Sequence, residues 1–297
     1  MNAHQPTSAA LDRDRLNAVF GLSAAIFVVE IVGGVLANSL ALLADAGHVF
    51  ADLAGIGLAL GAIWIAARPA TSGRTFGLYR TEILAAAVNA VVLFGLAGFI
   101  LYEAWLRVFH PPDVESGLML VVAVVALVAN SLSLYLLRDA QKRSLNMRAA
   151  YLEVMGDLAG SLGVVVAAAI IGVTGYRAAD AIASALIGLL ILPRTWSLLR
   201  QAVDVLLEAT PRSVDLDAVR AHIRSTDGVL DVHDLHAWTI TSGLNVVSAH
   251  VVVAPDCDSS AVLDGLCRCL SGDFDIEHST FQLEREDRRR LEERSHP

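Results

Sequence analysis

Long apolar runs separated by short polar segments fill the first two thirds of the chain. Six of these runs hold about 20 or more mostly apolar residues, the length that a helix needs to cross the hydrocarbon of a membrane. Backbone N–H and C=O groups find no water there, so each run is predicted to be a helix. The predicted spans are residues 16–37, 40–67, 82–105, 118–137, 149–173 and 180–199.

Beyond Pro211 the apolar positions follow the pattern of a small water-soluble domain. Two helices and three strands are predicted, with a Ser242-Gly243 turn between the first two strands. In chain order they are a helix over 214–225, strands over 229–241 and 244–254, a helix over 259–270 and a strand over 276–283. The order αββαβ is typical of a two-layer α+β domain.

The predicted fold is therefore a membrane all-α six-helix bundle followed by a small α+β domain. We expect four regions: an N-terminal tail (1–15), a six-span transmembrane domain (16–205), a C-terminal domain (206–285) and a charged tail (286–297). A content of 55% hydrophobic and 18% charged residues, with a mean hydropathy of +0.56, agrees with a polytopic membrane protein. The part from Gln201 onward holds 18 acidic and 9 basic residues, which argues against nucleic acid as a partner.

Basic residues near the span ends predict the orientation in the membrane. Nine of them flank one side of the predicted bundle and two flank the other, and the side richer in Lys and Arg faces the cytoplasm. Both termini are therefore expected in the cytoplasm. The nine are Arg13, Arg15, Arg68, Arg74, Arg80, Arg138, Lys142, Arg143 and Arg148, and the two are Arg107 and Arg177.

Ionisable residues interrupt two of the apolar spans at helical spacing. The second span contains Asp45, His48 and Asp52, and the fifth contains Glu153 and Asp157. Residues four apart share one face of a helix, so each span offers an i, i+4 pair. One imidazole and three carboxylates suit a tetrahedral site for Zn²⁺, and ionisable groups inside a membrane are functional by default.

Metal ligands must be deprotonated, so binding a metal ion at this site expels protons. That linkage is the physical basis for exchange of a metal ion against protons, with His48 as the expected proton carrier. Asp45 is expected either to orient His48 or to relay protons directly. An enzyme is not predicted, because four protein ligands leave no open position for a catalytic water.

Five motifs resemble the cation diffusion facilitator family, in order and over nearly the whole chain. They are SLALLADAGH (39–48) followed by Asp52, FGLYRTEI (76–83), DLAGSLG (157–163), HDLHAW (233–238) and SAH (248–250). The resemblance implies a homodimeric exporter that moves Zn²⁺ or related divalent ions out of the cytosol against protons. It also implies a bacterial-type inner (plasma) membrane location, a metallochaperone-like cytoplasmic domain for metal binding and dimerisation, and no prosthetic group.

The family's transport site maps onto His48, Asp52, Glu153 and Asp157. Zinc-selective members usually have histidine at position 153, and glutamate there resembles the bacterial branch that handles zinc, cadmium and cobalt. By the same resemblance, a regulatory metal site in the C-terminal domain would use His233, His250, His278 and Glu284, the alternative being that these histidines only pack or face solvent.

Two alternative functions stay open at this point. One is a membrane-bound metal sensor, in which the C-terminal domain binds metal and the bundle signals. The other is efflux of a different divalent metal, such as Mn²⁺ or Fe²⁺. Glu82 and Asp180 lie near span ends, where water is close, and are expected to have structural roles.

Overall fold

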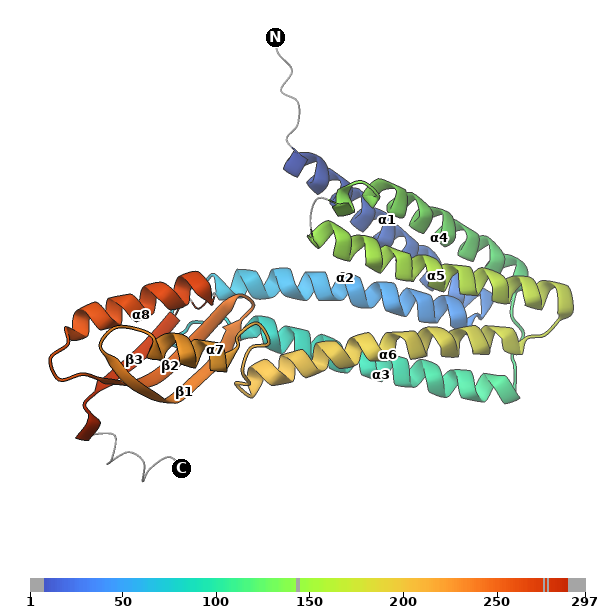
Figure 1. Ribbon diagram of the computed structural model, residues 1–297. Helices are drawn as coiled ribbons and strands as arrows, with labels where there is room; N and C mark the ends of the chain where they lie inside the picture. The colour runs from blue at the N-terminus through green and yellow to red at the C-terminus, as the bar shows by residue number, and fades with distance from the viewer. Residues whose placement is uncertain (1–7, 143–144, 275, 277, 288–297) are drawn as a thin grey trace, which may run out of the picture. The chain divides into compact units, whose positions relative to one another are not determined.

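The computed structural model describes residues 8–142, 145–274, 276 and 278–287 (Figure 1). The chain divides into two compact units, one of residues up to 58 with 88–197 and one of residues 59–87 with 198 onward. Residues 1–7 of the predicted N-terminal tail and residues 288–297 of the predicted C-terminal tail lie outside the described residues. The described part of the N-terminal tail is helical, because the first helix already begins at Ser8.

Within the described residues, six helices are long and apolar enough to cross a membrane, which confirms the predicted spans. Several helices run a few residues beyond the predicted spans, into charged or polar residues at their ends. The helices are α1 (Ser8–Ala37), α2 (Leu40–Ala66), α3 (Thr81–Phe109), α4 (Ser116–Leu137), α5 (Leu145–Thr174) and α6 (Ala178–Leu206), with a short 3₁₀ turn, η1 (Ala140–Lys142), after α4.

The junction between α1 and α2 follows from its local sequence. Asn38 adopts a left-handed φ of 52°, which asparagine tolerates, and so ends α1. The N–H of Ser39 then donates to the carbonyl of Gly34, and the Ser39 hydroxyl accepts from the N–H of Leu42 at 3.2 Å. Ser39 therefore closes one helix and caps the next.

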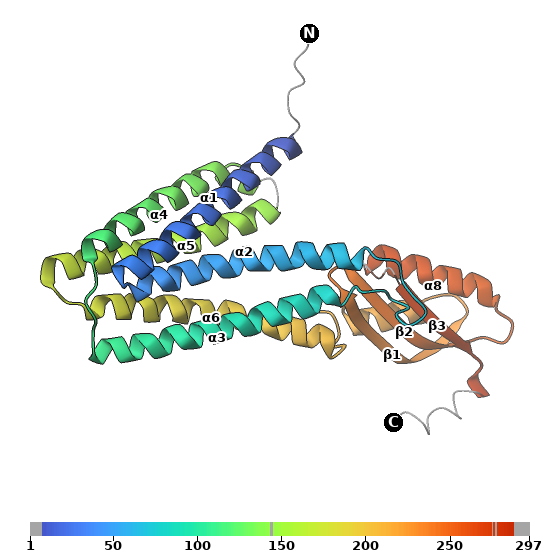
Figure 2. The same ribbon diagram turned by 180° about the vertical axis from the view of Figure 1, so that it is seen from behind.

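One large core holds the bundle together at the end where α1 joins α2, α3 joins α4 and α5 joins α6. All six helices contribute buried side chains to it, among them Ala37, Leu42, Ile100, Met119, Val164 and Ile187. A second buried cluster takes side chains from α1, α4, η1 and α5 alone: Val19, Leu137, Ala140, Met147 and Val154. Figures 1 and 2 show α4 and α5 beside α1, and α3 beside α6.

The C-terminal domain consists of α7 (Leu216–Arg224), β1 (Val229–Thr241), β2 (Leu244–Val253), α8 (Ser259–Asp273) and β3 (His278–Glu284). This is the predicted αββαβ order, so the fold class is confirmed. The sheet order is β1-β2-β3, with β1 antiparallel and β3 parallel to the central strand. Asp215 and Asp258 start the two helices, because each carboxylate accepts two backbone N–H groups of the first turn.

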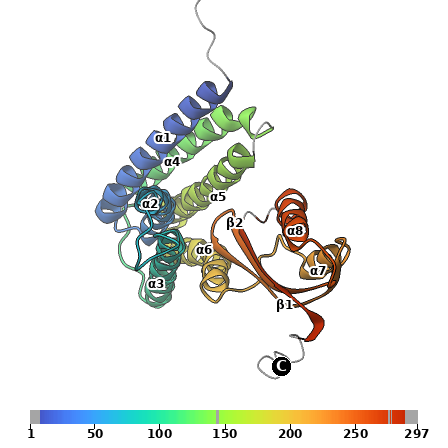
Figure 3. The ribbon, with the colours of Figure 1, turned by 90° about the vertical axis from the view of Figure 1, so that its left-hand side faces the viewer.

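The helices α7 and α8 pack against one face of the sheet (Figure 3). Alternate residues of β2, such as Val247, Ala249 and Val251, point into this core. The residues between them, His250 included, belong to the opposite face. In β1 a bulge follows His233, where Asp234 has a left-handed φ of 49° and the register with β2 shifts.

Candidate functional site

Three of the predicted ligands in the bundle meet where α2 faces α5. The His48 Nε2 atom lies 3.5 Å from Asp157 Oδ1 and 3.9 Å from Asp52 Oδ2. One ligand atom from each residue lies within 4.8 Å of the other two. Both carboxylate oxygens are buried and have no hydrogen-bond partner in the structure. Because unpaired buried oxygens are costly, the arrangement suits a cation that would satisfy both.

Glu153, the fourth predicted ligand, does not join these three atoms. Its Oε1 atom accepts a hydrogen bond from Nη2 of Arg194, on α6, at 3.1 Å. The same nitrogen lies 3.3 Å from Asp52 Oδ1. The structure therefore adds to the site a basic residue that the sequence interpretation missed.

Asp45 lies one helical turn from His48, and its hydrogen bond goes to α5. The Ser161 hydroxyl donates to Asp45 Oδ2 at 3.2 Å and accepts from the Asn130 amide at 3.1 Å. Glu30 of α1, only 1% exposed, interacts electrostatically with Asp45, and neither of its carboxylate oxygens has a hydrogen-bond partner. Neither predicted role of Asp45, orienting His48 or relaying protons, is tested by these contacts.

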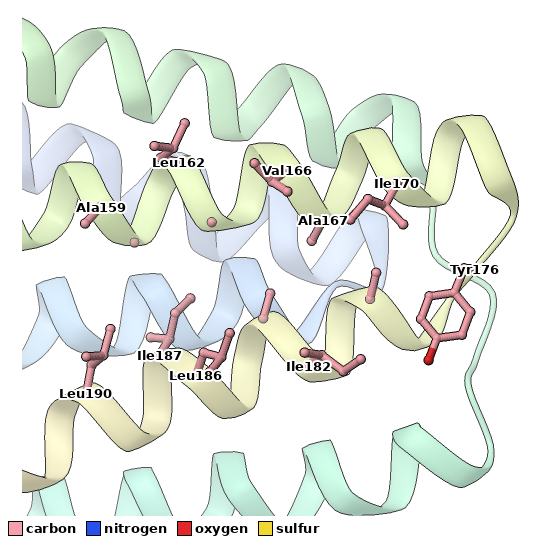
Figure 4. Close-up of a pocket in the computed structure, with 14 residues that line it drawn as sticks. Ala159, Leu162, Val166, Ala167, Ile170, Tyr176, Ile182, Leu186, Ile187 and Leu190 are labelled. Carbon is pink, nitrogen blue, oxygen red and sulfur yellow. The ribbon is translucent and has the colours of Figure 1, made fainter.

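The bundle unit holds a small cavity that reaches the ligands and a larger one that does not. A cavity of about 110 Å³ is lined by Asp52, Glu153 and Asp157 together with apolar residues of α1, α2 and α5. A larger one of about 550 Å³ lies between α5 and α6 (Figure 4). Its lining is apolar apart from the Tyr176 hydroxyl, so it offers no ligand set for a divalent cation.

A second cluster of ligand atoms lies on the face of the C-terminal sheet opposite to α7 and α8. His233 and His250 are direct partners across β1 and β2, and Glu284 stands at the end of β3. His250 Nδ1 lies 3.0 Å from Glu284 Oε1, and His233 Nε2 lies 3.4 Å from Glu284 Oε2. The Glu284 side chain is buried, and both His233 Nε2 and Glu284 Oε2 have no hydrogen-bond partner.

His278, the fourth residue predicted for this site, lies apart from the cluster of His233, His250 and Glu284. The parallel register pairs it with Val246, whereas Glu284 pairs with Val252, six residues further along β2. At about 3.3 Å per residue, that separation is roughly 20 Å. The His278 ring instead packs edge-on against Phe76, with ring centroids 5.9 Å apart.

Two acidic residues near span ends have the structural roles that the sequence indicated. Asp180 of α6 accepts hydrogen bonds from the Ser39 hydroxyl at 2.6 Å and from the N–H groups of Leu40 and Ala41, at the start of α2. Glu82, in the first turn of α3, accepts hydrogen bonds from the hydroxyls of Thr241 and Ser242, at the end of β1.

Comparisons with known proteins follow the same division of the chain. Residues 16–207 match the family model described as "Cation efflux transmembrane domain", and residues 211–286 match "Cation efflux protein, cytoplasmic domain". Both models describe cation efflux proteins, and together they account for nearly all of the described chain.

Three curated relatives are similar over most of their length. The metal cation efflux system protein CzcD of Cupriavidus metallidurans is 48% identical, over 91% of this chain and 85% of its own. The zinc transporter ZitB of Escherichia coli is 42% identical, over 95% and 92%. The cadmium, cobalt and zinc/H(+)-K(+) antiporter of Bacillus velezensis is 39% identical, over 86% and 83%. With its six membrane-crossing helices, this multi-pass membrane protein therefore belongs to the cation diffusion facilitator family of metal cation transporters.

Proposed function

We propose that the protein exports Zn²⁺, with Cd²⁺ and Co²⁺ as further substrates, from the cytosol in exchange for protons. The observation that carries the proposal is the cluster of His48, Asp52 and Asp157, whose ligand atoms lie within 4.8 Å of one another inside the apolar bundle. Imidazole and carboxylate ligands suit these borderline divalent ions. The names of the Escherichia coli and Bacillus velezensis relatives, a zinc transporter and a cadmium, cobalt and zinc antiporter, support the same substrates.

Proton exchange follows from the chemistry of these ligands. A metal ion enters only when the imidazole and both carboxyl groups are deprotonated, and its departure lets them take up protons again. Unpaired charge inside the bilayer is costly, so protons are the natural replacement for the departing cation.

Flux measurements in proteoliposomes test the proposal. Zinc should move when a pH gradient is imposed, and dissipating the gradient should stop it. Asp52→Asn and Asp157→Asn should each reduce the flux at least tenfold, because each removes a ligand oxygen, while the exposed Asp139→Asn serves as the matched control. Zinc flux that ignores the gradient would refute proton exchange.

The proposed arrangement is a homodimer in a bacterial inner membrane, with both termini in the cytoplasm. The charge asymmetry of the span ends supports the orientation. Single cysteines placed at position 113 and in the C-terminal domain should react from opposite sides of the membrane, after the native cysteines have been replaced. Light scattering of the purified protein should give twice the chain mass of 31.5 kDa.

The C-terminal cluster is proposed as a regulatory site for the same metal. His233, His250 and Glu284 supply two imidazoles and a carboxylate, which together suit Zn²⁺. Glu284→Gln in the full-length protein should remove one class of bound zinc in equilibrium dialysis and leave the class that Asp157→Asn removes. His278→Gln should leave both classes, because His278 pairs with Val246, far from Glu284 in the register.

A further inference from the structure

Arg194 contributes a fixed positive charge to the bundle site. One of its nitrogens, Nη2, lies 3.1 Å from Glu153 Oε1 on α5 and 3.3 Å from Asp52 Oδ1 on α2. A guanidinium does not lose its proton in proteins, so this charge is present in every state of the site. Arg194 follows Pro193, which removes one backbone hydrogen bond from α6 at this level.

The two oxygens of Asp52 have different neighbours. Oδ1 faces Arg194, whereas Oδ2 faces His48 and is buried without a hydrogen-bond partner. A metal ion bound through Oδ2 therefore does not compete with Arg194 for the same atom. Arg194 and the metal ion can be present together.

When Arg194 and a divalent metal ion are both present, the charges of the site balance. Among the groups that contact one another in this cluster, Asp52, Glu153 and Asp157 carry three negative charges when ionised, and a neutral His48 adds none. Arg194 reduces the total to two, which equals the charge of one divalent ion. In a medium of low dielectric constant a residual charge is costly, so this balance favours a neutral loaded site.

We propose that Glu153 serves as the partner of Arg194 instead of as a fourth metal ligand, and that this ion pair sets the affinity and the charge of the transport site. The ion pair of Glu153 and Arg194 carries no net charge, and it occupies the part of the site that a neutral fourth ligand would otherwise fill. This inference rests on the proposed function, because it assumes that His48, Asp52 and Asp157 bind the transported metal.

An ordinary surface ion pair is the competing explanation. The Arg194 side chain is 55% exposed and that of Glu153 33%, and exposed pairs contribute only about 0–1 kcal/mol to stability. Such a pair would hardly change metal affinity. The two explanations therefore differ in what happens to metal binding when each partner is removed.

The test measures the zinc affinity of the full-length protein in nanodiscs by competition with a chromophoric chelator. All variants carry Glu284→Gln, so that the bundle site is observed. Glu153→Gln should weaken zinc binding about tenfold, because Arg194 is left as an unpaired positive charge beside Asp52 (a tenfold change is about 1.4 kcal/mol). Adding Arg194→Gln to Glu153→Gln should restore the affinity to within threefold of the parent.

Two further variants complete the design. Arg194→Gln alone should bind zinc more tightly than the parent, since the site then carries an extra negative charge. Arg194→Lys should stay within threefold, because a single nitrogen makes both contacts and an ammonium group can replace it. Arg200→Gln, an exposed arginine further along α6, is the matched control.

The affinity and flux measurements distinguish an error about Arg194 from an error about the proposed function. If the double variant stays as weak as Glu153→Gln, Glu153 is a metal ligand and the proposal is wrong. Weaker binding by Arg194→Gln, or no effect of either substitution, would likewise overturn it. Zinc flux of the parent is measured in parallel: its absence refutes the proposed function, whereas the affinities alone decide the role of Arg194.

Discussion

Gly160 illustrates how a single residue controls the geometry of the buried polar groups in the bundle. A Cβ atom at this position would lie 2.6 Å from Asp45 Oδ1, far below van der Waals contact. Gly163, three residues further along the same helix, has open space at the corresponding point. The absent side chain at position 160 thus lets α5 approach Asp45 closely, as small residues do between membrane helices.

We expect Gly160→Ala to displace the Asp45 carboxylate and to weaken its hydrogen bond with Ser161. Zinc flux in proteoliposomes should fall several-fold, and thermal unfolding should shift down by a few degrees. Gly163→Ala is the control and should be neutral or slightly stabilising, because alanine favours helix by about 1 kcal/mol over glycine. Equal effects of the two substitutions would contradict a specific role for position 160.

Glu30 is a second residue whose substitution gives a clear expectation. Its carboxyl group is buried and lies close enough to that of Asp45 for the two acids to interact. Glu30→Gln replaces one of two adjacent buried acids with a neutral amide whose N–H can donate to Asp45, so the thermal unfolding temperature in detergent should rise. Glu103→Gln, next to Arg107 on α3, is the control and should lower it slightly or leave it unchanged.

Sequence reasoning found the residues that the spacing of a single helix aligns. It missed the residue whose position depends on packing between helices. His48, Asp52 and Asp157 stood out because helical spacing aligns them within apolar spans. Arg194 did not, because its place beside Glu153 depends on how α6 packs against α2 and α5. No pattern within α6 alone specifies that contact.

At the scale of whole elements, Asp180 links the start of α2 to α6. Its carboxylate accepts two backbone N–H groups and the hydroxyl of Ser39, so it acts as an N-cap supplied by another helix. A negative charge at a helix N-terminus is also favoured by the helix dipole. The two helices are thereby held together at the end of the bundle where all six helices share one core.

Replacing Asp180 with Asn should cost about 1–3 kcal/mol, because an amide has only one accepting oxygen and a buried N–H group is left unpaired. Thermal unfolding should occur at a lower temperature than in wild type. Hydrogen exchange should be faster at Leu40 and Ala41 and unchanged in α4. Asp204→Asn, near the far end of α6, is the control for loss of an acidic residue from this helix.

Strand register in the C-terminal domain shows the same limit of sequence reasoning. The alternation of β1 and β2 and the Ser242-Gly243 turn predicted the hairpin, because a two-residue turn fixes an antiparallel register. The register of β3 was not predictable, because a parallel strand reaches its partner through a helix and no turn sets the pairing. For this reason the sequence alone could not place His278 relative to Glu284.

At the scale of the molecule, the unit that contains the C-terminal domain also includes the start of α3. Glu82 accepts hydrogen bonds from Thr241 and Ser242, and Arg80 pairs with Glu208 at 2.7 Å. The start of a membrane helix and the end of β1 are thus joined through the side chains of Glu82, Thr241 and Ser242. A change in the C-terminal domain has a direct physical route to α3.

We expect Glu82→Ala to reduce the maximal rate of zinc transport at least threefold and to leave zinc affinity unchanged. The substitution removes the acceptor for two hydroxyl groups but touches neither ligand cluster. Arg74→Ala, at an exposed position in the preceding loop, is the control. Unaltered transport by Glu82→Ala would mean that the contact only positions the domain.

The Asp180 cap also has a consequence for the order in which the protein is made. Ribosomes synthesise α2 long before α6, and the capping carboxylate lies 140 residues after Leu40. Until α6 has been inserted, the first turn of α2 must find other hydrogen-bond partners. A nascent chain that ends before Asp180 should therefore expose the start of α2 to proteases, and completion of the sixth helix should be the step that protects it.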